Sequence, residues 1–104
     1  MKPYHKLVRD RIPEIVKNEG KIVSTQTLTD ELFRIALSDK LQESITEYSA
    51  DPSAVGLVDI LEVIYAIAQS KYDLSHLGLE KLRVERLIER GGYDNHTLLI
   101  ESSD

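Results

Sequence analysis

The sequence contains no cysteine and no tryptophan, and its few aromatic residues are mostly tyrosine. The absence of cysteine excludes disulfide bonds and every metal site built on thiolate ligands. No apolar run approaches the roughly 20 residues that span a bilayer, and the N-terminus carries no apolar signal segment. We therefore expect a cytoplasmic protein that has no membrane partner.

Positive net charge is also lacking. The 104 residues carry a net charge of −5, which argues against binding to duplex nucleic acid, because that binding relies on a positive surface. The chain length fits a single domain over residues 1–104. Basic residues gather near both ends and acids gather in the middle, which would suit a small anionic ligand beside an acidic, cation-binding centre. The basic residues are Lys2, Lys6, Arg9 and Arg11 at the start, and Lys81, Arg83, Arg86 and Arg90 late in the chain.

The hydrophobic pattern predicts an all-α domain, a bundle of three main helices plus a short N-terminal helix. We expect the short helix over about 10–18, with Gly20 as its C-terminal cap. The main helices are expected over about 30–50, 54–71 and from the cap Ser75 to about Arg90. Two minor β segments, near 22–28 and 97–101, are rich in β-branched residues and could pair with each other.

The helix over 54–71 is apolar almost all the way round, which is typical of a helix buried between others. Two partner helices in one small chain would not cover it. We therefore expect a homodimer or homotetramer that completes the core. Only Asp59 and Glu62 place charge within the apolar stretch, about one turn apart on one face. Buried carboxylates are costly unless they are paired, protonated or bound to a cation.

The preceding helix offers Glu43 and Glu47 as further acids. Its apolar stripe is formed by Phe33, Leu37, Leu41, Ile45 and Tyr48. A helical wheel places Glu43 roughly opposite this stripe, Glu47 at its edge and Ser44 closer to its centre.

Carboxylates from two facing helices can build a divalent-metal site, and oxygen ligands favour Mg²⁺ or Mn²⁺ over zinc. The alternative is that Asp59 and Glu62 form structural ion pairs with Lys40, Arg34 or Arg86. Spacing alone leaves both possibilities open. The three histidines show no ligand spacing to one another.

Four segments of the chain form a recognisable set, namely Lys6-Leu7-Val8-Arg9-Asp10-Arg11-Ile12-Pro13-Glu14-Ile15, Lys40-Leu41-Gln42-Glu43, Asp59-Ile60-Leu61-Glu62-Val63-Ile64 and Arg90-Gly91-Gly92-Tyr93. In this order they resemble the MazG-like and phosphoribosyl-ATP pyrophosphohydrolase-like family of all-α nucleoside triphosphate pyrophosphohydrolases. The resemblance implies Mg²⁺-dependent hydrolysis of a nucleotide between its α and β phosphates.

The family's metal signature reads Glu-Glu-x-x-Glu on one helix and Glu-x-x-Asp on the next. Glu43, Glu47 and Asp59 match it, whereas Ser44 and Gly56 stand where the family has carboxylates. The resemblance thus implies Glu47 and Asp59 as metal ligands and Glu43 and Glu62 as catalytic or auxiliary groups. By resemblance, the phosphate-binding candidates are Lys6, Arg9, Arg86 and Arg90.

Because two ligand positions differ, two further hypotheses stay open. The chain could be a catalytically inactive module that binds a nucleotide or a protein on the same scaffold. It could also be a purely structural oligomer whose acids form interhelical ion pairs.

Overall fold

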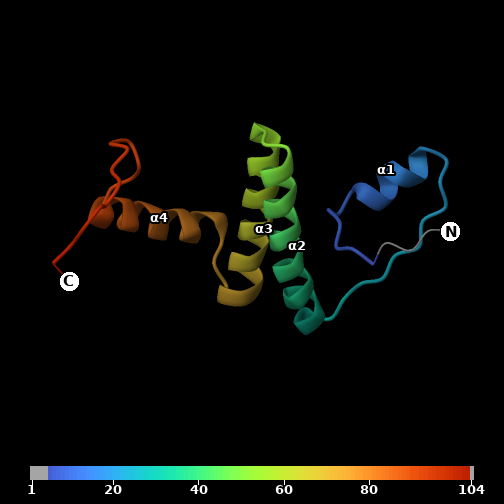
Figure 1. Cartoon of the computed structure of the whole chain (residues 1–104). Helices are drawn as coiled ribbons and strands as arrows, with labels where there is room; N and C mark the ends of the chain where they lie inside the picture. Colours follow the sequence, from blue (N-terminus) through green and yellow to red (C-terminus); the bar gives the residue numbers. More distant parts are fainter. Residues whose placement is uncertain (1–4, 104) are drawn as a thin grey trace.

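A computed structural model describes residues 5–103 as four helices joined by short turns and extended segments (Figure 1). The all-helical architecture with one short and three main helices confirms the predicted fold class. Lys2, part of the basic N-terminal cluster, lies outside the described residues. The helices are α1 (Ile12–Asn18), α2 (Asp30–Ala50), α3 (Ala54–Tyr72) and α4 (His76–Arg90).

Each main helix begins at a hydroxyl cap. Thr29, Ser53 and Ser75 have extended backbones, and each side-chain oxygen accepts a hydrogen bond from the backbone N–H three positions later, at 3.0–3.3 Å. These bonds satisfy donors that the first turn of a helix would leave unpaired. Gly20 and Gly91 follow α1 and α4 with φ of +86° and +78°, a conformation that favours glycine. Local chemistry therefore sets the helix bounds.

The core lies between α2 and α3, which run side by side as a hairpin (Figure 1). The buried residues are Leu37 and Ser44 on α2, and Val63 and Ala68 on α3. Small side chains at Ser44 and Ala68 favour close approach of the two helices. Packing of this pair brings the C-terminal end of α2 next to the N-terminal end of α3.

The buried side of α2 differs in one place from the predicted apolar stripe. Leu37 is 3% exposed and Ser44 only 4%, whereas Ile45 is 42% exposed. The helical wheel had placed Ser44 toward the centre of the stripe, and its burial confirms that placement. The Ser44 hydroxyl therefore lies in the interface between the two helices, whereas Ile45, a residue of the predicted stripe, is exposed.

The helix α4 leaves the hairpin at the end of α3 and extends away from α2 (Figure 1). The radius of gyration is 18.1 Å, and the longest dimension is 60 Å. A compact domain of this length would have a radius of gyration of about 13 Å. The single chain is thus extended, and none of the α4 residues is buried.

The two predicted β segments are wrong. Within the described residues, 22–28 and 97–101 are extended but form no strand. They lie at opposite sides of the molecule in Figure 1, so neither finds a partner. A strand needs hydrogen bonds to a neighbour, and β-branched composition does not supply them.

The helix α3 is less enclosed than its apolar sequence predicts. Val63 and Ala68 are buried, but Val55, Val58 and Leu61 are exposed. Among the helices of residues 5–103, α2 makes most of the contacts with α3, and α4 makes few. Among the described residues, no helix is both long and apolar enough to cross a membrane.

Candidate functional site

A pocket of about 410 Å³ lies where α2 ends and α3 begins. Ser44, Glu47 and Tyr48 of α2 line it together with Gly56 and Asp59 of α3. The four positions at which the resemblance places metal ligands therefore meet around one pocket. Two of them are carboxylates, one is a buried hydroxyl and one is a glycine that contributes no side chain.

A basic segment preceding α1 reaches the acids beside this pocket. Arg9 Nη2 donates to Asp59 Oδ1 at 2.7 Å, and Lys6 Nζ donates to Glu43 Oε1 at 3.2 Å. The sequence predicted that Asp59 would meet either a cation or a basic side chain. In the structure that side chain is Arg9, rather than the Lys40, Arg34 or Arg86 considered from the sequence.

Glu43 is held between two lysines. Besides Lys6, Lys40 lies 3.4 Å from its carboxylate, and the Glu43 side chain is about three-quarters buried. Burial raises the pKa of Glu43, but the hydrogen bonds and charges of Lys6 and Lys40 outweigh this effect and leave the pKa below its ordinary value. Glu43 is therefore a paired, largely buried carboxylate, although the helical wheel places it roughly opposite the apolar stripe of α2.

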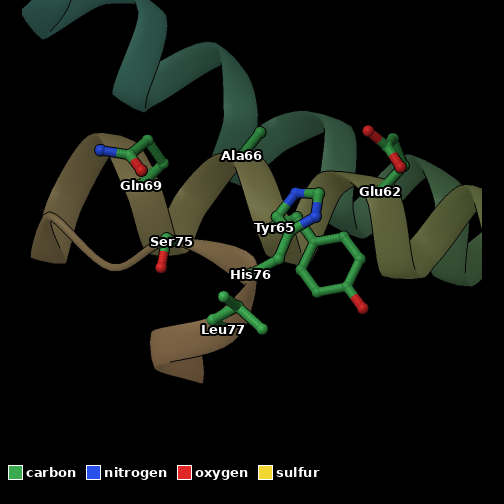
Figure 2. Close-up of a pocket in the computed structure, with 7 residues that line it drawn as sticks. All are labelled: Glu62, Tyr65, Ala66, Gln69, Ser75, His76 and Leu77. Atoms are coloured by element: carbon green, nitrogen blue, oxygen red, sulfur yellow. The ribbon is translucent and has the colours of Figure 1, made fainter. Parts of the chain in front are cut away.

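Glu62 faces a different pocket. This second pocket, of about 440 Å³, lies between α3 and the start of α4 and is also lined by Tyr65, Gln69 and His76 (Figure 2). The rings of Tyr65 and His76 stack there with centroids 3.9 Å apart. Asp59 and Glu62 are only one turn apart on α3, yet the structure places them at separate pockets.

Arg86 and Arg90 lie on the exposed helix α4, which projects from the end of α3 opposite the junction with α2 (Figure 1). Neither lines the pocket of Glu47 and Asp59. Of the four predicted phosphate-binding residues, Lys6 and Arg9 are therefore next to the candidate site. Within one chain, Arg86 and Arg90 are on a different part of the molecule.

The donor set fits Mg²⁺ in kind but is small in number. Across residues 5–103, no group of three or more acidic or histidine side chains is arranged to hold a metal ion. Mg²⁺ commonly takes one or two carboxylates from the protein and completes its shell with water and substrate phosphates. Glu47 and Asp59, which line one pocket together with Ser44, would offer two carboxylates to such an ion.

The pairing of Arg9 with Asp59 could not be read from the sequence. The two residues are 50 positions apart, and Arg9 is followed by a helix and an extended segment before the hairpin begins. The Tyr65–His76 stack could not be read from the sequence either, because it depends on how α4 is placed against α3. The sequence signal for both contacts is the residue type alone.

No protein-family model matches the chain. A curated protein of Mycolicibacterium smegmatis (strain ATCC 700084 / mc(2)155), described as an uncharacterized protein, is 43% identical over 44 residues. That match covers 42% of this chain and 45% of the relative. No solved structure matches the chain.

Proposed function

We propose that the protein binds a nucleotide at the pocket of Glu47 and Asp59 and hydrolyses it between the α and β phosphates, with Mg²⁺ or Mn²⁺ as cofactor. Water would attack phosphorus and the phosphoanhydride bond would break, releasing a nucleoside monophosphate and pyrophosphate. The observation that supports this most is the convergence of Glu47 and Asp59, from two helices, on one open pocket. The MazG-like resemblance supplies the reaction class.

The surroundings of the pocket supply positive charge for phosphates. Arg9 forms an ion pair at 2.7 Å with Asp59, which lines the pocket, and Lys6 forms one at 3.2 Å with Glu43. A guanidinium group binds phosphate oxygens in a bidentate manner. Basic groups and carboxylates side by side are what a cation–nucleotide complex requires, since the carboxylates bind the cation and the basic groups bind the phosphates.

Of the two predicted auxiliary acids, Glu43 is the better placed. It is held by Lys6, which belongs to the same basic segment as Arg9, whereas Glu62 lines the other pocket. We therefore assign Glu43 the role of orienting water or Lys6 near the phosphates. Glu62 would act only if a ligand extended toward α4.

The second candidate function is a catalytically inactive nucleotide-binding or protein-interaction module. It is favoured by the loss of two carboxylates, because Ser44 is buried between the helices and Gly56 has no side chain. Affinity for a hard cation falls as charged ligands are removed. Binding would persist in such a module, but hydrolysis would not.

Pyrophosphate release from a panel of nucleoside triphosphates, with Mg²⁺ and then Mn²⁺, tests the first proposal. Hydrolysis that is lost in Glu47→Gln and Asp59→Asn supports it, and no release with either metal rejects it. The double variant Ser44→Glu/Gly56→Glu separates the two candidates, with Ser44→Ala/Gly56→Ala as its control. A Cβ at position 56 would lie 3.3 Å from Ser53 Oγ, so the cap must shift by only a few tenths of an ångström. Activity seen only in the glutamate variant would show that the natural chain is inactive through loss of ligands.

We also propose that the chain forms a homodimer or homotetramer in the cytoplasm. The extended shape and the exposed apolar residues of α3 and α4 support this, because a partner subunit would remove them from water. Val55 and Val58 on α3 and Leu77 and Ile88 on α4 are examples. Arg86 and Arg90 would then be free to serve a neighbouring subunit's site.

A further inference from the structure

We infer that Arg9 and Lys6 are exchangeable counter-ions of the acidic pocket. They neutralise Asp59 and Glu43 while no cation is bound, and a divalent cation that binds Asp59 must compete with Arg9 for its charge. The inference rests on the proposed function, both in taking Asp59 as a ligand of the cation and in the transfer of the released basic groups to phosphate.

The Arg9–Asp59 contact has the geometry of a strong pair but the exposure of a weak one. The 2.7 Å distance is that of a charge-assisted hydrogen bond. The two side chains are nevertheless 52% and 47% exposed. Ion pairs this exposed contribute little to folding stability, since water screens both charges. The contact can therefore open without disturbing the helix pair.

The segment that carries the two basic groups makes few contacts with the α2–α3 hairpin. Lys6 and Arg9 precede α1, and α1 has no buried residue. From residue 5 onward, the ion pairs of this segment with α2 and α3 are Lys6–Glu43 and Arg9–Asp59. Lys40, by contrast, reaches Glu43 from the same helix, three positions away. Loss of the Arg9 contact therefore removes one of these two ion pairs and leaves Lys6 and Lys40 on Glu43.

A guanidinium group and a divalent cation compete for the negative charge of Asp59. Mg²⁺ binds a carboxylate oxygen at about 2.0–2.1 Å, closer than Arg9 Nη2 now lies. The ion would then meet the guanidinium as a like charge at short range, which is unfavourable. Arg9 on Asp59 therefore lowers the affinity of this carboxylate for a cation, and binding of a cation favours the departure of Arg9.

The released groups have a suitable new partner when the cation arrives with a nucleotide. Phosphate oxygens accept bidentate hydrogen bonds from guanidinium. The cation takes the carboxylates, and Arg9 and Lys6 take the phosphates. Cation and nucleotide should therefore strengthen each other's binding, and the coupling is reciprocal.

Titration of the full chain with Mn²⁺ alone, followed by electron paramagnetic resonance, tests the competition without relying on hydrolysis. Arg9→Gln removes the competing charge and should bind Mn²⁺ at least about fivefold more tightly than the natural chain. The control is Arg11→Gln, because Arg11 belongs to the same segment but pairs locally with Glu14 at 3.5 Å. Its Mn²⁺ affinity should equal that of the natural chain.

Unchanged or weaker Mn²⁺ binding by Arg9→Gln overturns the inference, as does the absence of Mn²⁺ binding to all three proteins at millimolar concentration. A non-hydrolysable triphosphate added in a second titration should tighten Mn²⁺ binding to the natural chain and do so less in Arg9→Gln. Tighter Mn²⁺ binding by Arg9→Gln without pyrophosphate release by any form would reject hydrolysis and leave the exchange intact. Hydrolysis without the affinity difference would reject the exchange alone.

Discussion

Arg9 and Asp59 are 50 positions apart in the chain, and their side chains meet at 2.7 Å beside the junction of α2 and α3. This contact links the basic N-terminal segment to the acidic centre, the two regions that the charge distribution singles out. Asp59, an acid in an otherwise apolar helix, is thus paired with a guanidinium group of the same chain. If a metal ion can compete with Arg9 for Asp59, the pocket is a binding site. If it cannot, the Arg9–Asp59 contact is a structural ion pair.

Asp59→Asn should change stability and ligand binding by very different amounts. Because the Arg9–Asp59 pair is about half exposed, its loss should lower the free energy of unfolding by less than about 1 kcal/mol. Binding of a metal–nucleotide complex should fall at least tenfold, about 1.4 kcal/mol, because one of two carboxylate ligands is gone. Urea denaturation and calorimetric titration measure the two effects. Equal ligand affinity in Asp59→Asn and the natural chain would contradict the assignment of Asp59.

Leu37→Ala should be strongly destabilising. Leu37 is 3% exposed between α2 and α3, and truncation of such a side chain leaves a cavity that typically costs about 2–5 kcal/mol. Ile22→Ala is the matched control, because that side chain is 83% exposed and should shift stability by no more than about 0.5 kcal/mol. Thermal or urea unfolding followed by circular dichroism compares the two. Similar losses in both variants would mean that Leu37 is not a core residue.

Glu43→Gln should make stability less dependent on pH at acidic values. The folded-state pKa of Glu43 lies below its ordinary value of 4.5, so its pairs with Lys6 and Lys40 stabilise the fold fully above pH 4.5. That stabilisation is lost as the pH falls through the folded-state pKa and the carboxyl becomes protonated. The natural chain should therefore be more stable than Glu43→Gln at pH 7, and the difference should shrink toward pH 3. Urea midpoints measured at both pH values check this; a constant difference would show that the lysines do not act through charge.

Ile88→Glu should weaken self-association. Ile88 is 81% exposed on α4, and Leu77 and Val84 lie on the same side of the helix at spacings that form one stripe. A charge in a buried apolar interface is unfavourable, so multi-angle light scattering should show a lower mass for Ile88→Glu than for the natural chain. Glu85→Gln, elsewhere on α4, should leave the mass unchanged. A monomeric natural chain at micromolar concentration would reject the oligomer itself.

The apolar periodicities and capping residues determined most of the secondary structure. Thr29, Ser53 and Ser75 begin the main helices as their chemistry predicts, and Gly20 and Gly91 follow the ends of α1 and α4, because caps and left-handed glycines act over three or four residues. The helical wheel likewise placed Ser44 near the interface. Such local interactions leave a signal in consecutive residues.

Only the tertiary structure decided which acids share a pocket. Glu47 and Asp59 line one pocket because α2 and α3 pack as a hairpin, while Glu62, one turn from Asp59, lines the pocket beside α4 instead. The tertiary structure also decided that Arg9 is the partner of Asp59 and that the two predicted β segments do not pair. Both outcomes depend on where segments far apart in the chain lie in space. Residue spacing within a helix determines the direction in which each side chain points around the helix axis. It does not determine which residues of other segments that side chain faces.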